Sequence, residues 1–477
     1  MNALLAALTV ALAVAVAVAI PGGAAALLLC APFAAGAGLL LSMSAGEQQR
    51  TFLLKIFVGG LLVRMAVGVV INGFELQEFF GGDALTYDWL GGHLLETWRG
   101  NVQMMPELKT WNVAGGWGML YVVAAIYAVV GRNMLAVQFF NAVLGAATAP
   151  VIFLCARQIF QNVRVAKVAA VSVAFYPSLV LWSSQALKDG PIVFLLALSM
   201  LATLKLGEHL SVRYAVTLLL SLFAVLTLRF YIFYMLSAAV GGAFLVGMRP
   251  LTTQSLARQL AVVLALGLGL TYFGVVRMAG AQFEQFGNLS AVQQSRSDLA
   301  RSANTGFAAD VDVSTTAGAL SVVPLGMAYL LFAPFPWQLA SLRQSITLPE
   351  MVLWWASFPL LVLGAWFTLS YRLRQALPIL IFTTMLTLAY SIFQGNVGTA
   401  YRQRSQILVF YFIFVAVGAV LLKERQEEGQ RQVLAQKQSQ IDKVRATVGG
   451  QRYAHWDAER GQELERVARD IAGRINF

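Results

Sequence analysis

Long apolar runs constrain this chain most, because about 20 apolar residues in a helix are enough to cross the hydrocarbon core of a bilayer. Such runs lie at residues 3–20, 24–42, 53–73, 133–154, 168–185, 191–206, 215–229, 230–247, 259–277, 351–369, 377–393 and 406–422. Only 12% of the residues are charged, against about 25% in ordinary soluble domains. The sequence therefore predicts an all-α polytopic membrane protein, a bundle of about 12 to 13 transmembrane helices.

The distribution of Lys and Arg predicts which connections face the cytoplasm. These residues recur in every second connection: Arg50, Lys55, Arg157, Arg164, Lys167, Lys205, Arg213, Arg249, Arg258, Arg372 and Arg374. The opposite, non-cytoplasmic face then receives the loops 74–132 and 278–320 and the segment 336–350. We expect the polar loop 278–320 to be mobile until a ligand orders it. The alternation requires the short, proline-broken run 321–335 to re-enter the membrane or to span it in an unusual way, and the run 120–130 is expected to be interfacial or re-entrant.

The composition changes sharply at Lys423 and predicts two regions. Residues 1–422 form the transmembrane domain, and residues 423–477 form a charged, helical cytoplasmic tail that lies on a surface, binds a partner protein or forms a coiled segment. The net charge of +11 is expected of basic loops that face anionic membrane lipids. No nucleic-acid-binding module is present. Cys30 and Cys155 form neither a disulfide framework nor a metal-binding pair.

Charged residues at the predicted non-cytoplasmic helix ends are the candidates for function. An ionised side chain inside a span costs about 2.5–3.5 kcal/mol on insertion scales, so such residues need an explanation. The candidates are Asp83, Asp88, Lys188, Asp189, Arg229, Arg402 and Arg404. Cations on this face indicate a phosphate, which Arg binds through two parallel hydrogen bonds and Lys meets as a point charge. Alternatively, the cations extend to lipid head groups or pair with the nearby Asp residues. Arg64, in the middle of a span, is interpreted as a structural charge that faces the bundle interior.

Asp83 follows Gly81 and Gly82, where the helix predicted over 56–73 reaches water. A carboxylate at this depth can meet both a lipid-borne and a water-borne substrate, which suits a catalytic base. Alternatively, Asp83 is the N-cap of a helix that begins at Ala84, and the two roles are compatible.

An ordered series of motifs resembles a known superfamily. Gly82-Asp83-Ala84 with Tyr87 resembles the first-loop motif of C-type (GT-C) membrane glycosyltransferases, an Asp followed a few residues later by Tyr. Residues 131–206 resemble the core of the protein O-mannosyltransferase and aminoarabinose-transferase relatives. The motifs there are Gly131-Arg132-Asn133, Ala174-Phe175-Tyr176-Pro177 and Trp182-Ser183-Ser184-Gln185-Ala186-Leu187-Lys188-Asp189-Gly190-Pro191. Gly190 separates Asp189 from Pro191 and so departs from the family's Asp-Pro-like turn. The resemblance covers about residues 75–210 of the sequence.

The resemblance implies an inverting glycosyltransferase that moves a sugar from a polyprenyl-phosphate donor to a glycan, lipid or protein acceptor at the periplasmic face. Asp83 would deprotonate the acceptor hydroxyl. Because the leaving group is a stable phosphate anion, no strong general acid is required. Arg402 and Arg404, and secondarily Lys188, would stabilise its developing charge.

Further substrate contacts are expected from the remaining candidates. Asp189 would orient Lys188 or bind sugar hydroxyls, Tyr87 would stack on a sugar ring, and Asp88 and Arg229 complete the substrate-binding set. No cofactor is expected. Some members of the superfamily use a divalent metal, but Asp83 and Asp88 lack a tight Asp-x-Asp spacing, so we predict none.

Two other functions remain open at this point. A polymerase or ligase of lipid-linked glycans, of the O-antigen or exopolysaccharide type, would also have an Arg-lined periplasmic cavity but would take a pyrophosphate-linked donor. A transporter would show inverted repeats and charges deep within its spans. The sequence has no internal repeat, and its charges gather at one face, which favours the transferase.

Overall fold

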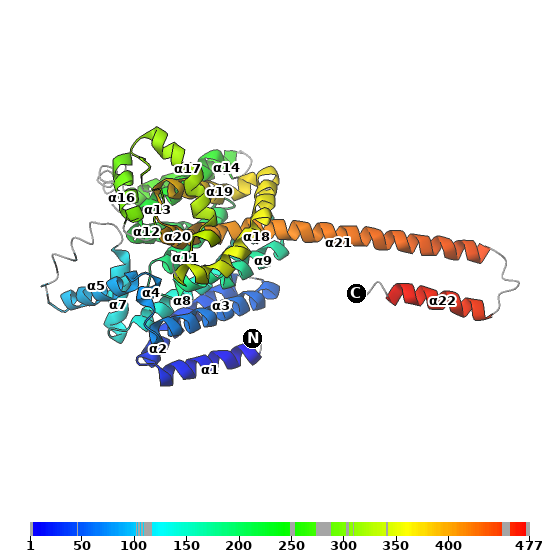
Figure 1. Cartoon of the computed structure of the whole chain (residues 1–477), viewed down its shortest axis with the longest axis horizontal. Helices are drawn as coiled ribbons and strands as arrows, with labels where there is room; N and C mark the ends of the chain where they lie inside the picture. The colour runs from blue at the N-terminus through cyan, green and yellow to red at the C-terminus, as the bar shows by residue number, and fades with distance from the viewer. Residues whose placement is uncertain are drawn as a thin grey trace. The chain divides into compact units, whose positions relative to one another are not determined.

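The structure is a computed structural model and is helical throughout the part it describes (Figure 1). It describes residues 3–44, 46–101, 103, 105, 108, 117–248, 253–272, 288–301, 305–308, 310–339, 342–450 and 458–473. Within these ranges the only β-pairing is an isolated bridge between Gly306 and Asn396. In the described part of the chain, seven helices are long and apolar enough to cross a membrane, and a bent helix pair makes an eighth candidate. The predicted all-α polytopic membrane protein is confirmed.

The first half of the chain is organised around α8 (Met134–Phe160), which is buried along most of its length. It packs against α2 (Gly23–Ser44), α3 (Glu47–Gly73) and α11 (Asp189–Leu206), while α1 (Ala3–Ala19) packs on α2. Small side chains along α8, among them Gly145 and Ala146, allow this close approach.

The predicted span 168–185 is two helices rather than one. α9 (Val163–Phe175) and α10 (Pro177–Ser183) meet at an angle of 54°. Pro177 causes the break, because proline disfavours the helical conformation in the residue before it, and Tyr176 is extended with φ −65° and ψ 126°. The break turns α10 and the segment after it towards the candidate site described below.

The second half of the chain contributes the remaining helices around the candidate site. These are α12 (Val212–Leu228), α13 (Phe230–Val246), α14 (Thr253–Tyr272), α16 (Leu289–Arg301), α17 (Thr316–Phe332), α18 (Leu342–Tyr371), α19 (Leu373–Phe393), the short α20 (Val397–Gln403) and α21 (Ser405–Gly450). α19 packs against α13 and α17, and α11 packs against α12, which joins the two halves. The run 321–335, expected to be short and broken, lies mostly in α17, a helix of 17 residues with Pro324 inside it.

The structure describes part of the loop 278–320, whose expected mobility stays a prediction. α16 is anchored by Arg296, whose side chain is buried and donates to the backbone oxygens of Ile392 (3.0 Å) and Gln394 (2.5 Å). The bridge that Gly306 forms with Asn396 continues this attachment. A buried guanidinium that satisfies two carbonyls at once attaches α16 to the end of α19 and to the segment after it.

The remaining helices include those of the first long loop. α4 (Gln77–Phe80) and α5 (Asp83–Trp98) precede α7 (Gly118–Val130), the helix expected to be interfacial or re-entrant, and α7 packs against α5.

Contacts divide the chain into two compact units, residues 1–419 and 420–477. The second unit contains the end of α21 and α22 (Ala458–Gly473), whose apolar residues include Leu464 and Val467, three positions apart.

A close helix contact gives a stability prediction. A Cβ added at Gly364 of α18 would lie 1.8 Å from the backbone oxygen of Phe414 in α21, whereas one added at Gly241 of α13 would meet nothing within 4 Å. Gly364→Ala should therefore cost about 1–3 kcal/mol through overpacking and lower the thermal unfolding temperature in detergent, while Gly241→Ala should not. Equal unfolding temperatures for the two variants would contradict this packing.

Candidate functional site

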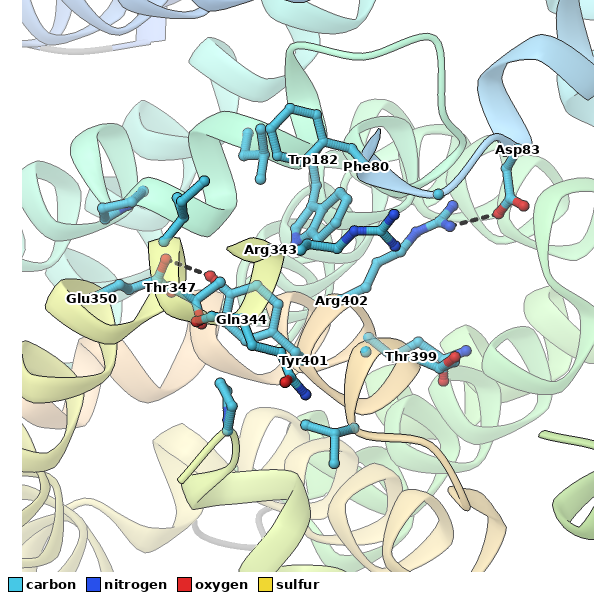
Figure 2. A pocket seen from close by; sticks show the side chains of 18 of the residues that line it. Phe80, Asp83, Trp182, Arg343, Gln344, Thr347, Glu350, Thr399, Tyr401 and Arg402 are labelled. Carbon is cyan, nitrogen blue, oxygen red and sulfur yellow. Dashed lines mark hydrogen bonds and ion pairs between the residues drawn. The ribbon is translucent and has the colours of Figure 1, made fainter. Parts of the chain in front are cut away.

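A cavity of about 980 Å³ opens where the two halves of the helical bundle meet (Figure 2). Its walls come from α3, α5, α10, α18 and α20 and from the segments that precede α11 and α13. One end is polar and is lined by Asp83, Thr86, Tyr87, Lys188, Arg229 and Arg402. The remaining wall is largely apolar and includes Val63, Val67, Phe175, Pro177, Val180, Leu181, Ile346 and Pro349.

Arg402 connects the two carboxylates of the polar end. Its Nη1 lies 2.5 Å from Oδ2 of Asp83, and its Nη2 and Nε lie 2.6 and 2.8 Å from Oδ2 of Asp189. Figure 2 shows the side chain extending from α20 towards Asp83. Residues from three distant parts of the sequence therefore meet in one charge cluster.

Asp189 is the buried centre of this cluster. Its side chain is 0% exposed, and Nη2 of Arg229 lies 3.6 Å from its second oxygen, Oδ1. The residue begins α11, where the positive end of the helix dipole also favours a carboxylate. Lys188, the residue before it, lines the cavity, and burial followed by the nearby Arg229 charge lowers the pKa of Lys188 to about 8.

Buried side chains hold the segment that carries Lys188 and Asp189. Nδ2 of Asn141, in α8, donates to the backbone oxygens of Gln185 and Leu187, both at 2.7 Å. Non-helical backbone inside a protein needs partners for its polar groups, and Asn141 supplies them for two carbonyls. These two hydrogen bonds attach the segment to α8.

Arg402 is positioned by α20, a helix of seven residues. Asn396 caps its N-terminus by accepting from the backbone N–H groups of Gly398 (2.7 Å) and Thr399 (3.4 Å), and it also accepts from the hydroxyl of Thr305 (2.8 Å). Trp182, from α10, forms the wall behind Arg402, with the guanidinium 5.7 Å from the ring centroid.

The turn before α5 presents Asp83 to the cavity. Gly81 and Gly82 have φ values of +132° and +74°, conformations that side chains with a Cβ rarely adopt. Gly82 is the N-cap of α5, which begins at Asp83, and no side chain makes a capping hydrogen bond. The alternative prediction, that Asp83 caps a helix beginning at Ala84, was therefore wrong. Tyr87 is one helical turn further along and lines the same cavity; burial, with Asp189 next, raises its pKa, so the phenol stays protonated.

Asp88 and Arg404 lie outside the cavity, contrary to their predicted contact with substrate. Asp88 accepts hydrogen bonds from Tyr127 and Arg132 and so ties α5 to α7 and to the segment before α8. The guanidinium of Arg404 is fully buried and donates to the backbone oxygens of Leu331 (3.0 Å) and Ala333. Both are structural charges in the described part of the chain.

Arg64 matches its structural interpretation. It is 1% exposed and donates to Oγ of Ser183 (2.8 Å) and to the backbone oxygens of Gly60 (3.0 Å) and Ala174 (2.8 Å). It therefore joins α3 to α9 and α10 beneath the site.

Sequence reasoning missed two charged residues of the cavity wall, Arg343 and Glu350, both in α18. Arg343 packs over the ring of Phe79 and donates to the backbone oxygen of Glu78 (3.3 Å), across the rim from α4. Glu350 is buried and accepts from the hydroxyl of Tyr401 (2.7 Å). An acidic residue directly before an apolar run was the available signal for Glu350.

Chemically, the arrangement offers an accessible carboxylate, at Asp83, beside fixed cations in a partly apolar cavity. The side chain of Asp83 is 52% exposed, whereas those of Asp189 and Arg402 are 0% and 15% exposed. Asp83 can therefore meet a substrate, and the buried pair beside it can supply a preorganised positive charge. Among the described residues, no group of three or more His, Cys, Asp or Glu side chains could hold a metal ion, and metal independence stays a prediction.

The contrast between Asp83 and Asp189 gives a second prediction. Asp189→Asn would leave Arg402 and Arg229 without their buried counter-charge and should cost about 3–5 kcal/mol of stability. Asp83→Asn removes an ion pair in which the Asp83 side chain is half exposed, and it should cost about 1 kcal/mol of stability or less. Thermal unfolding of both variants in the same detergent checks this order, and a larger loss for Asp83→Asn would contradict it.

Comparison with known protein families gives a match over part of the chain. Residues 101–222 match the family described as Dolichyl-phosphate-mannose-protein mannosyltransferase. This match includes α7 to α11 and therefore Trp182, Lys188 and Asp189 of the site. No curated protein matches the sequence. The family match and the polytopic helical fold together support a membrane glycosyltransferase of the GT-C superfamily, of the type that depends on a polyprenyl-phosphate sugar.

Proposed function

We propose that the protein transfers a sugar, with inversion, from a polyprenyl-phosphate donor to the hydroxyl of a glycan, lipid or protein acceptor at the periplasmic face of a bacterial inner membrane. The observation that carries the proposal is Arg402 held between the exposed Asp83 and the buried Asp189 at the polar end of the cavity. This places a base candidate and a phosphate-binding candidate side by side, as the reaction requires.

The charges at the polar end support a donor with a single phosphate. Lys188, Arg229 and Arg402 contribute three positive charges, and Asp83 and Asp189 contribute two negative ones, so the cluster carries +1 when all are ionised. A sugar linked through one phosphate is a phosphodiester with one negative charge. The pyrophosphate-linked donor of a polymerase or ligase would bring two.

The apolar wall of the cavity supports a lipid-borne donor. Val63 in α3, Phe175 at the end of α9 and Ile346 in α18 line the cavity and are 40%, 44% and 57% exposed. An apolar wall that is also exposed suits the first isoprene units of a polyprenyl chain, which would reach the surrounding lipid between these helices.

In the proposed reaction, the acceptor hydroxyl gives its proton to the carboxylate of Asp83 while its oxygen bonds to the anomeric carbon. The bond between that carbon and the phosphate oxygen breaks, and its electron pair stays on the polyprenyl phosphate. Arg402, with Lys188 and Arg229, stabilises the negative charge that develops there. Because this anion is a good leaving group, the carboxylate of Asp83 is the only proton-transfer group that the step needs.

The proposed orientation rests on the basic residues. Asp83, Lys188, Arg229 and Arg402 lie at helix ends opposite to the connections rich in Lys and Arg, which face the cytoplasm in most membrane proteins. The site then faces the periplasm, where a lipid-linked sugar and an exported acceptor can meet.

The test is a pair of variants that separates binding from chemistry. Arg402→Gln should lose retention of undecaprenyl phosphate in native mass spectrometry, whereas Asp83→Asn should keep the lipid and lose transfer of mannose from polyprenyl-phosphate mannose. Undecaprenyl diphosphate serves as the competitor and should be retained less well. Full transfer by Asp83→Asn would remove it as the base, and preferential retention of the diphosphate would favour the polymerase or ligase.

The pKa of Lys188 predicts a pH dependence. Because this pKa is lowered to about 8, Lys188 is positively charged below pH 8 and loses its charge as the pH rises through that value. Affinity for undecaprenyl phosphate should therefore fall as the pH increases from about 7 to about 9. Lys188→Arg keeps its charge over this range and should remove the decline. An identical decline in Lys188→Arg would assign it to another group.

A further inference from the structure

The carboxyl group of Glu350 is an ionisable group in the cavity wall that the proposed reaction does not use. It is 5% exposed, and no Lys, Arg or His among the described residues forms an ion pair with it. The hydroxyl of Tyr401 donates to its Oε2 at 2.7 Å, and Ser178, Tyr176 and the guanidinium of Arg404 also lie near the carboxyl. Burying a carboxyl costs free energy unless it is paired or hydrogen-bonded, so its position beside the site calls for a role.

Tyr401 is the residue directly before Arg402 in α20, and it is held on two sides. Its hydroxyl is bound by Glu350, and the guanidinium of Arg404 lies 5.2 Å from its ring centroid. Its ring also meets Trp182 edge to face, with the centroids 6.3 Å apart. Tyr401 is therefore fixed in place although α20 has only seven residues.

Tyr401 and Arg402 extend in different directions from α20, because consecutive helical residues are about 100° apart around the axis. Figure 2 shows Tyr401 directed towards Glu350 and Arg402 directed towards Asp83. A helix of fewer than two full turns has little stability of its own, so side-chain contacts set its rotation. Because the two residues are consecutive, any rotation of α20 that displaces Tyr401 displaces Arg402 as well.

We propose that Glu350 is a positioning residue: through Tyr401 it fixes the rotation of α20 and thereby the place of the Arg402 guanidinium between Asp83 and Asp189. The inference rests on the proposed function of Arg402. Glu350 does not touch the phosphate or the sugar in this role. It holds the helix from the α18 side, so α18 contributes to the site without supplying a reacting group.

The proposal predicts which substitutions at Glu350 are tolerated. Glu350→Gln keeps an oxygen that can accept from Tyr401, whereas Glu350→Leu does not. Loss of one buried hydrogen bond in a positioning network corresponds to about a tenfold effect on rate. In steady-state transfer assays, Glu350→Leu and Tyr401→Phe should each lower kcat/KM for the donor about tenfold, and Glu350→Gln should restore most of it.

A matched control on the same helix separates positioning from stability. Nε1 of Trp355 donates to the backbone oxygen of Phe332 (3.1 Å), which anchors α18 without involving α20. Trp355→Phe should lower the unfolding temperature about as much as Tyr401→Phe and leave kcat/KM unchanged. A fall in kcat/KM for Trp355→Phe equal to that of Tyr401→Phe would reduce Glu350 to a structural residue.

The decisive measurement is a double-mutant cycle with Arg402. If Glu350 acts through Arg402, adding Glu350→Leu to Arg402→Gln should change kcat/KM less than twofold, although it changes the wild type about tenfold. Multiplicative effects would overturn the positioning role. If Arg402→Gln alone leaves donor binding and transfer intact, the proposed function fails first, so the two failures are distinguishable.

Discussion

The site depends on a carboxylate, Asp189, that is buried between two guanidinium groups. Its side chain is 0% exposed, with Arg402 at 2.6 Å and Arg229 at 3.6 Å. Removing three charges from water is costly, and it is sustained only because each charge neutralises another at close range. Three helix ends, the start of α11, the α12–α13 junction and α20, must therefore stay together, and this requirement fixes the shape of the cavity.

Irregular backbone at this membrane face is stabilised in the same way. The segment before α11 has two carbonyls bound by Asn141, and Arg296 binds one carbonyl in the last turn of α19 and one in the α19–α20 connection. Because such segments lack helical hydrogen bonds, their carbonyls need fixed donors inside the protein. The polar side chains that look functional in the sequence are thus of two kinds, those that face the cavity and those that support the backbone around it.

Much of the site follows from where charges occur in an apolar sequence. Asp83, Lys188, Asp189, Arg229 and Arg402 stand at helix ends on one face and do converge. Helix geometry explains the error at Asp88: Tyr87 is one turn after Asp83 and shares its face, whereas a residue five positions on points elsewhere.

Arg402 and Arg404 show why the sequence could not decide the rest. They lie two positions apart at the end of the short helix α20. Residue type alone predicts that both bind phosphate. Arg402 points into the cavity, while Arg404 is enclosed by the carbonyls of Leu331 and Ala333. The difference is set by the rotation of α20, which depends on contacts with α17 and α18, elements distant in the sequence. Glu350 was missed for the same reason, because its proposed role depends on its contact with Tyr401, which is distant in the sequence.

The pairing of Asp83 with Arg402 has a consequence for the order of events in the proposed reaction. The candidate base, Asp83, and the candidate phosphate ligand, Arg402, lie 2.5 Å apart and neutralise each other. In the proposed reaction, a donor phosphate that binds Arg402 competes with Asp83 for the guanidinium. Asp189 stays paired with Arg402 because its side chain is buried. Arg402 then exchanges its exposed partner for the phosphate, and Asp83 is released for the acceptor hydroxyl. One guanidinium with a fixed and an exchangeable carboxylate therefore couples donor binding to the availability of the base.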